Sequence, residues 1–319
     1  VFIKFKTKPN PERGIDDNTY FLVWTTTPWT LPGNVALAVG KEIDYVFARR
    51  LSEPLIGMDE YSSEKSAKPT VEKLIMSKSA YDKFKQPSMR PQENLRLSDE
   101  FDPSPSKYLL DLEYEPPYKT NDTDKKAYYV VAGNFVTTQE GTGIVHIAPA
   151  FGADDSEVGK KYDLPTLVTV DIEGRMSADV PGKGLLVKKK NDKGEYAVDQ
   201  LIIEDLQKRN ILFKLEKYEH DYPFCRRCDT PLIYYAKISW FVRMSELADE
   251  LVKNNENINW IPGHIKQGRF GEWLKDVKDW AISLERYWGT PLPISVCKKC
   301  GEIKVAESIK ELEELSGKK

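Results

Sequence analysis

Four threonine hydroxyls and one amide crowd a short segment near the N-terminus, residues 25–34, which we call the threonine loop (TTTPWTLPGN). They belong to Thr25, Thr26, Thr27, Thr30 and Asn34. Small donors and acceptors of this kind can hold a ribose, an ester carbonyl or a water molecule. The same groups could instead cap the end of a strand, and the composition of the loop does not separate these two interpretations.

One imidazole and two adjacent carboxylates lie in residues 141–155, which we call the aspartate segment (GTGIVHIAPAFGADD). They belong to His146, Asp154 and Asp155. An aspartate here could bind a substrate ammonium, because each charge keeps the other group ionised. In the structural alternative, Asp154 and Asp155 form the N-cap and first turn of a helix that runs through Val158. A lone histidine in such a segment is also more often structural than catalytic.

The four cysteines of the chain form two Cys-x-x-Cys pairs, Cys225 with Cys228 and Cys297 with Cys300. No secretion signal is evident, so this spacing favours metal binding over structural disulfides. Two such pairs brought together would supply the four thiolates of a zinc site.

The threonine loop follows a predicted strand, residues 19–24, which is a run of β-branched and aromatic side chains. Two prolines and a glycine in the loop forbid regular structure directly after that strand. Residues 35–39 and 128–132 are further predicted strands. We therefore expect the hydroxyl groups to lie where the chain leaves a sheet.

Two helices and two loops are predicted between the strands and the cysteines. Residues 63–86 place apolar side chains among lysines and are typical of a helix, and residues 87–107, rich in Pro, Ser, Asp and Glu, predict a surface insertion. Residues 195–209 predict an amphipathic helix with one apolar face. That face comprises Val198, Leu201, Ile202 and Leu206. Lys188, Lys189 and Lys190 are expected in a solvated loop.

The composition of the chain narrows its class. Its 319 residues are enough for two domains, and 40% hydrophobic residues are ordinary for a globular protein. A net charge of −3 excludes binding of nucleic acid by bulk charge, so any RNA contact must rest on local patches or on parts of a larger protein outside this sequence. No apolar stretch approaches the ~18 residues of a membrane span. The chain does not begin with Met, and we expect it to be cut from a longer protein.

The threonine loop and the aspartate segment together resemble the paired signatures of the editing domain shared by the isoleucyl, valyl and leucyl tRNA synthetases of class I. The signatures are a threonine-rich peptide and a Gly-Thr-Gly…His…Ala-Pro…Asp-Asp peptide, in this order. Residues 220–235, HDYPFCRRCDTPLIYY, favour the isoleucyl type, and residues 239–243, SWFVR, and 286–291, RYWGTP, support this choice. The resemblance covers essentially the whole chain.

This resemblance implies an α+β fold with two parts. The composition itself places the boundary near residue 218, because the remainder holds five of the seven tryptophans and all four cysteines. Residues 1–217 would form a mainly β, barrel-like editing domain with peripheral helices. Residues 218–319 would form a smaller α+β connective portion that leads back to the catalytic core of the parent enzyme.

The resemblance also implies roles for single residues. Asp155 would bind the α-ammonium of a misattached amino acid, and Thr26 and Thr27 would hold the ester, the terminal ribose or the attacking water. His146 would line the pocket for the amino-acid side chain and exclude isoleucine by bulk. The remaining substrate-binding positions would be Asn34, Trp24, Thr25, Thr30, Phe151 and Asp154, with Trp24 and Phe151 as candidate walls.

The implied reaction is hydrolysis of valine from tRNA(Ile). A synthetic site for isoleucine cannot strongly reject valine, since one methylene is worth only ~1–3 kcal/mol, a general value for which isoleucyl enzymes are themselves the standard example. An aminoacyl ester is already activated, so a positioned water without a cofactor could suffice. Partners would be the acceptor end of tRNA(Ile) and the rest of the synthetase, in the cytoplasm and away from membranes.

The motifs for making the aminoacyl bond are missing from this sequence. No His-Ile-Gly-His signature occurs, and residues 76–79, MSKS, only partly match a Lys-Met-Ser-Lys-Ser signature and lie between the two editing signatures. ATP would therefore serve only the full-length parent. The chain would be a fragment of an isoleucine-tRNA ligase with aminoacyl-tRNA hydrolase activity.

The resemblance also affects the zinc prediction. In many isoleucyl-type enzymes, the cysteine pair that corresponds to Cys225 and Cys228 shares a metal site with cysteines upstream of the editing domain. The pair that corresponds to Cys297 and Cys300 shares a site with cysteines further downstream. Each pair would then be half of a site whose partners lie outside this sequence. One shared zinc ion stays open as the simpler alternative.

Two other functions stay open beside the isoleucyl assignment. The chain could be the editing domain of the related valyl enzyme, which would remove threonine. It could also bind the acceptor end of tRNA without turning over as an isolated fragment.

Overall fold

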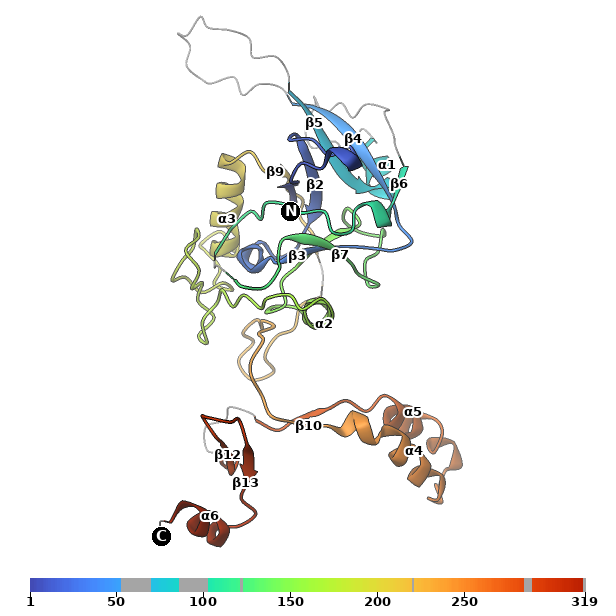
Figure 1. Cartoon of the computed structure of the whole chain (residues 1–319), viewed down its shortest axis with the longest axis vertical. Helices are drawn as coiled ribbons and strands as arrows, with labels where there is room; N and C mark the ends of the chain where they lie inside the picture. The colour runs from blue at the N-terminus through green and yellow to red at the C-terminus, as the bar shows by residue number, and fades with distance from the viewer. Residues whose placement is uncertain (53–69, 86–102, 121–122, 220, 284–288, 318–319) are drawn as a thin grey trace, which may run out of the picture. The chain divides into compact units, whose positions relative to one another are not determined.

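The computed structural model describes residues 1–52, 70–85, 103–120, 123–219, 221–283 and 289–317 (Figure 1). Parts of the segments 63–86, 87–107, 220–235 and 286–291 discussed above lie outside these residues. The chain forms two compact units, residues 1–236 and residues 237–319, which we describe separately.

Nine strands of the described residues form one sheet in the first unit. They are β1 (Phe2–Lys6), β2 (Thr19–Trp24), β3 (Ala36–Val39), β4 (Asp44–Ser52), β5 (Thr70–Ser77), β6 (Pro103–Pro105), β7 (Tyr129–Ala132), β8 (Ile144–Ile147) and β9 (Leu212–Lys214). Their order is β6-β4-β5-β2-β8-β3-β7, while β1 pairs with β2 and β9. The sheet curls into a half-barrel with helices around it, which confirms the predicted barrel-like α+β fold (Figure 1).

Strand β2 lies between β5 and β8 in the sheet, and both of its faces are buried. Phe21 and Val23 belong to the main hydrophobic cluster on one face. Leu22 belongs to a second cluster on the other face, with Leu74 of β5 and the apolar side of helix α1 (Lys78–Lys85). A strand covered on both faces has a continuous apolar run instead of an alternating pattern, and this is the run that predicted the strand.

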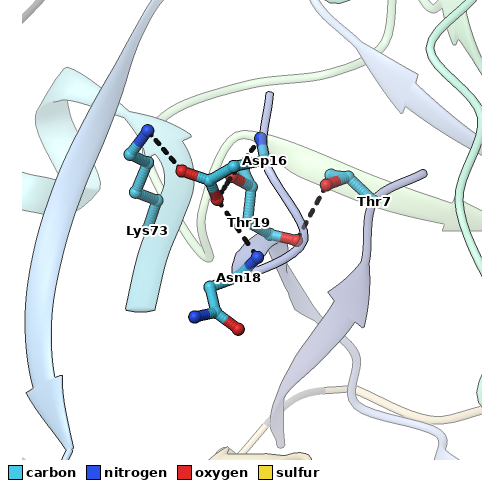
Figure 2. Close-up of polar contacts among 5 residues, drawn as sticks. All are labelled: Thr7, Asp16, Asn18, Thr19 and Lys73. Carbon is cyan, nitrogen blue, oxygen red and sulfur yellow. Dashed lines mark hydrogen bonds and ion pairs between the residues drawn. The ribbon is translucent and has the colours of Figure 1, made fainter. Parts of the chain in front are cut away.

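The connection between β1 and β2 is fixed by hydrogen bonds around Asp16 (Figure 2). The Asp16 carboxylate accepts from the Thr19 hydroxyl at 2.7 Å and from the Asn18 backbone N–H at 3.1 Å, and it pairs with Lys73 of β5 at 2.6 Å. The Thr7 hydroxyl donates to the Thr19 carbonyl at 2.8 Å. These bonds tie the start of β2 to β1 and β5, and so fix the strand whose far end carries the threonine loop.

Two helices of the first unit come from the predicted segments. Helix α2 (Ala153–Lys161) begins at the aspartates, and α3 (Ala197–Lys208) confirms the amphipathic helix predicted for residues 195–209. Val198, Ile202 and Leu206 are buried as predicted. The prediction for Leu201 was wrong: its side chain is 37% exposed, and Ile203 is buried instead.

The helix predicted for residues 63–86 is only partly present. Residues 70–77 form strand β5, and the helix α1 begins at Lys78. Residues 63–69 lie outside the described part of the chain. Leu74 and Met76 face one hydrophobic cluster while Ile75 between them faces the other, which is the period of a strand. Apolar side chains spaced among lysines were compatible with both periods.

The remaining elements are short. The first unit also has the 3-10 helices η1 (Pro11–Arg13), η2 (Pro28–Gly33) and η4 (Ser106–Tyr108). The second unit contains β10 (Phe241–Val242), η5 (Met244–Leu247), α4 (Ala248–Glu256), η6 (Gly263–Ile265), α5 (Arg269–Lys275), β11 (Trp280–Ala281), β12 (Ile294–Val296), β13 (Ile303–Val305) and α6 (Ile309–Ser316). This second unit is thus a small α+β body.

The two compact units divide after Ala236, whereas the sequence predicted a boundary after residue 217. Contacts hold the intervening residues to the first unit. The Ala236 backbone N–H donates to the Ala150 carbonyl at 2.8 Å, and the Tyr218 ring packs edge-on against Trp24 at 5.3 Å. Across the described residues, no helix combines the length and the apolar character that a membrane span requires.

Candidate active site at the ends of strands β2 and β8

The threonine loop and the second half of the aspartate segment leave the same edge of the sheet. Strands β2 and β8 run parallel, with Trp24 paired to Val145. The loop follows the carboxyl end of β2, and Ala148 onward follows the carboxyl end of β8. Parallel strands place their carboxyl ends at one edge, so the topology brings together the two segments that the sequence singled out.

The threonine loop is folded tightly on itself. It forms the 3-10 helix η2 after Thr27, with Pro28 at the first helical position, where a missing N–H costs nothing. The Thr25 hydroxyl accepts from the Thr27 backbone N–H at 3.1 Å, and the Thr30 hydroxyl donates to the Thr27 carbonyl at 2.7 Å. Thr26 alone of the four threonines is exposed. The hydroxyls of Thr25, Thr27 and Thr30 therefore make hydrogen bonds within the loop, as the structural interpretation of these groups expects.

A hydrogen-bonded chain links the two segments. The Thr27 and Thr30 hydroxyl oxygens lie 3.3 Å apart, and the Thr30 hydroxyl lies 3.1 Å from His146 Nε2. Because the single Thr30 hydroxyl proton points to the Thr27 carbonyl, Nε2 of His146 must be the donor to Thr30. His146 then carries its lone pair on Nδ1. Burial lowers the pKa of His146 to about 4, so the ring is neutral at pH 7.

Two buried polar atoms at this junction have no hydrogen-bond partner among the described residues: His146 Nδ1 and Trp29 Nε1. One is an acceptor and the other a donor. Buried polar groups in folded proteins are almost always paired, so an orphan of each kind calls for a water or a ligand group. Both belong to side chains that join the two segments.

An aromatic contact joins the segments at a second point. The Trp29 and Phe151 rings meet edge-on with their centroids 5.0 Å apart. A Cβ at Gly33 would lie 3.0 Å from the Phe151 ring, so this glycine lets the ring approach the loop. Trp24, the other predicted wall, packs against Tyr218 and away from this contact.

Asp155 lies in the first turn of α2, as does Asp154, and the N-cap is Gly152. The Asp155 carboxylate folds back over the turn and lies close to Gly152. A Cβ at Gly152 would lie only 1.9 Å from Asp155 Oδ2, so the missing side chain leaves room for the carboxylate. Burial, reinforced by the charge of Asp154, raises the pKa of Asp155 to about 7, although a hydrogen bond from the Ala148 backbone opposes the rise. A carboxylate this poorly solvated at a helix N-terminus is suited to receive a cation.

Asn34 is placed differently from the other candidates. Its side chain is fully buried, with Nδ2 donating to the Ala36 carbonyl at 3.0 Å and Oδ1 accepting from the Tyr114 hydroxyl at 2.7 Å. The amide is thus used to anchor the end of the threonine loop. Its predicted role in substrate binding would require the loop to move.

Thr26 lines a cavity of about 430 Å³ together with Trp24 and Thr25. The acidic residues in that lining are Glu195, Asp199 of α3 and Glu216, and Asp155 is not among them. The structure therefore joins Thr27, Thr30, His146, Trp29 and Phe151 directly, whereas the cavity that Thr26 lines does not include Asp155.

Sequence reasoning missed Asp199. Its Oδ1 accepts a hydrogen bond from the Trp29 backbone N–H at 2.9 Å, and the residue is 9% exposed. The signal was present in the sequence, because Asp199 sits among the apolar positions of the amphipathic helix, next to Val198 and three residues before Ile202. A carboxylate on a buried helix face needs a partner, which here is a loop 170 residues away.

The two cysteine pairs adopt the same turn. The Cys225 backbone N–H donates to the Thr230 carbonyl, and the Cys225 carbonyl accepts from the Asp229 backbone N–H. The Cys297 backbone makes the same pair of bonds with Glu302 and Gly301. Asp229 and Gly301, four residues after the first cysteine of each turn, both have positive φ, 53° and 73°.

This geometry fits two ligands of a metal ion in each turn. The first pair lies in the first unit and the second pair in the second unit. The described residues hold no cluster of three or more candidate ligands, so zinc binding stays a prediction.

Comparison with known proteins agrees with the resemblance. The chain is 46% identical over 315 residues to the isoleucine–tRNA ligase of Clostridium acetobutylicum, covering 98% of this chain and 26% of that protein. The isoleucine–tRNA ligase of Thermus thermophilus is 41% identical with the same coverage. The chain therefore spans about a quarter of the length of these relatives.

Two solved structures are more distant. The structure of GlLeuRS-CP1 has a TM-score of 0.46 and 16% identity, covering 68% of this chain and 99% of that one. The editing domain of the Plasmodium knowlesi cytosolic leucyl-tRNA synthetase has a TM-score of 0.44 and 14% identity, covering 74% and 95%. Since both TM-scores are below 0.5, the function proposed below rests on this chain's residues and its sequence relatives. Residues 37–319 match the class I tRNA synthetases of the isoleucine, leucine, methionine and valine group, and the chain belongs to this family.

Proposed function

We propose that this chain carries the editing site of an isoleucyl-tRNA synthetase, which hydrolyses the ester of valine misattached to tRNA(Ile). The observation that carries the proposal is the joining of the threonine loop to the aspartate segment through Thr27, Thr30 and His146 at the carboxyl ends of β2 and β8. Its sequence relatives are isoleucine ligases, which favours the isoleucyl enzyme over the valyl alternative.

Asp155 would recognise the amino acid through its α-ammonium. Its raised pKa means that the carboxylate is short of solvation in the free chain. An ammonium ion beside it would restore the ionised form by direct pairing. Esters without a free amine would lack this interaction, so Asp155 would select aminoacyl esters.

The water that attacks the ester carbonyl would be held by hydroxyl groups of the threonine loop. Thr26 is the exposed hydroxyl, and Thr27 is half-buried beside Thr30. Water adds to the carbonyl carbon, the ester bond to the ribose oxygen breaks, and that oxygen takes a proton as valine leaves. No strong base is needed at the start, because oriented hydrogen bonds stabilise the developing oxyanion.

His146 would form part of the wall around the amino-acid side chain. A neutral, buried ring held by Thr30 is a rigid surface against which a larger side chain would clash. The site would accept valine and refuse isoleucine, the reverse of the preference of the synthetic site. We place the reaction in the cytoplasm, on the acceptor end of tRNA(Ile), with the rest of the synthetase as partner.

The residue-level test is replacement of Asp155. Asp155→Ala should abolish deacylation of Val-tRNA(Ile) while the melting temperature stays close to that of the unmodified chain. Glu157→Ala, on the exposed side of the same helix, is the matched control and should keep full activity. Normal hydrolysis by the Asp155 variant would remove this residue from the mechanism.

One alternative has a specific observation in its favour. The chain spans about a quarter of the length of its relatives, so contacts that hold the tRNA could lie elsewhere in the parent. The chain would then bind the acceptor end without turnover. Adding the remaining parts of the synthetase in trans, or testing the full-length enzyme, should in that case restore hydrolysis that the chain alone lacks.

A further inference from the structure

The start of η2 is held by a residue from outside the threonine loop. Thr27, the N-cap, makes no side-chain capping bond to the helix. Instead the Asp199 carboxylate of α3 accepts from the Trp29 backbone N–H at 2.9 Å. A carboxylate supplied by another helix thus does what an N-cap side chain usually does.

A lysine enclosed by aromatic rings accompanies this contact. The Lys188 ammonium lies 4.4 Å from the Tyr222 ring centroid, 4.7 Å from that of Tyr196 and 5.7 Å from that of Trp29. The sequence predicted a solvated loop for residues 188–190, and this was wrong for Lys188, which is half-buried. Cations over ring faces are stabilised by the ring quadrupole, more strongly when desolvated.

The two groups depend on each other electrostatically. Burial raises the pKa of Asp199 to about 6, and the charge of Lys188 acts against that rise. Burial lowers the pKa of Lys188, and the charge of Asp199 acts against that fall. Each charge thus offsets part of the desolvation cost of the other. Both residues also contact Trp29: Asp199 accepts from its backbone N–H, and the Lys188 ammonium lies over its ring.

We infer that Asp199, supported by Lys188, is a positioning residue that fixes the threonine loop in the geometry required for hydrolysis. This inference rests on the proposed function. Trp29 lies between the two residues of the hydroxyl chain, Thr27 and Thr30. Holding the Trp29 backbone therefore holds Thr30 against His146, and it holds the Trp29 ring against Phe151.

The inference predicts a loss of turnover without a loss of fold. In the whole chain, Asp199→Ala should lower kcat for deacylation of Val-tRNA(Ile) roughly tenfold to a hundredfold, with KM within about twofold, because the bond lost is one to a charged acceptor. Asp199→Asn retains an oxygen that can accept from Trp29, and it should recover most of the lost rate.

Asp205→Ala is the matched control. Asp205 lies on the same helix and also anchors it, through the Tyr118 hydroxyl at 2.8 Å, but its side-chain partners, Tyr118 and Arg209, lie outside the threonine loop. It should lower the melting temperature by a similar amount while kcat stays within about twofold. An equal loss of kcat in both alanine variants, or no rescue by asparagine, would overturn the positioning role.

Hydrogen exchange separates this inference from the proposed function. Asp199→Ala should speed exchange of the backbone amides of residues 25–34, and Asp205→Ala should not, whether or not the chain hydrolyses any ester. If neither the unmodified chain nor the full-length enzyme deacylates Val-tRNA(Ile), the proposed function fails while exchange still tests the contact. Unchanged exchange at Trp29 in Asp199→Ala would sink the inference alone.

Discussion

Single residues divide into those whose role follows from chemistry and those whose role depends on a distant partner. The threonine hydroxyls, His146 and Asp155 could be singled out from the sequence because polar and ionisable side chains cost free energy to bury unless they have a partner. The structural roles of Asn34 and Asp199 could not be predicted in this way. The Asn34 amide is used by Tyr114, and the Asp199 carboxylate by Trp29, and both partners are remote in sequence. Residue type predicts the chemistry available, whereas the fold decides which groups remain free.

The pH dependence of deacylation belongs to this scale. Only the ionised Asp155 attracts an ammonium, and its pKa in the free chain is raised to about 7. Therefore kcat/KM should fall as the pH drops below about 7. It should fall again above about pH 8, where the α-ammonium of the substrate loses its proton. His146, with its pKa lowered to about 4, stays neutral and adds nothing to the acid limb. A rate profile over about pH 5.5 to 8.5 measures it, and a flat profile would contradict the assignment.

Specificity for the smaller side chain is also a property of one residue. His146→Ala removes the ring from the wall, so Ile-tRNA(Ile) should become a substrate, with hydrolysis at least about tenfold faster than in the unmodified chain. Deacylation of both esters measures the change. If the variant still refuses isoleucine, then His146 does not form the excluding surface.

Strands and helices were predictable where one period dominates. The apolar run of β2 and the amphipathic face of α3 were both visible, and the structure confirms them. The segment that became β5 and α1 was not resolved by its pattern, because spaced apolar residues fit a strand and a helix alike. The parallel pairing of β2 with β8 decides where the two loops meet. Pairing between strands so distant in sequence leaves no local signal.

The turn before α2 offers a test at the scale of the element. A Cβ at Gly152 would lie 1.9 Å from Asp155 Oδ2 and would push the carboxylate out of its turn. Gly152→Ala should therefore lower deacylation by about tenfold or more, while α2 itself remains helical. Gly263→Ala is the control, because a Cβ there meets nothing within 4 Å. Full activity in Gly152→Ala would show that the position of the carboxylate does not matter.

At the scale of the whole molecule, the chain is two compact units that together cover about a quarter of the relatives' length. Each unit carries one Cys-x-x-Cys turn with two thiols. The spacing of the cysteines identified both turns, but it did not predict their backbone conformation. The resemblance implied that the partners of each pair lie outside this sequence.

Metal analysis tests that implication. The purified chain should hold well under one zinc ion per molecule, because two thiolates bind zinc far more weakly than four. Elemental analysis after dialysis gives the content. One tightly held zinc per chain, lost equally on Cys225→Ser or Cys297→Ser, would instead show that both pairs share one site.

The proposed site is defined by selective hydrolysis of the valine ester over the isoleucine ester. The most direct measurement is the rate of amino-acid release from Val-tRNA(Ile) and from Ile-tRNA(Ile) in the presence of this chain, against the spontaneous rate of each. We predict rapid release of valine and release of isoleucine close to the spontaneous rate. Equal release of both amino acids, or release of neither by the chain and by the full-length enzyme alike, would contradict the account.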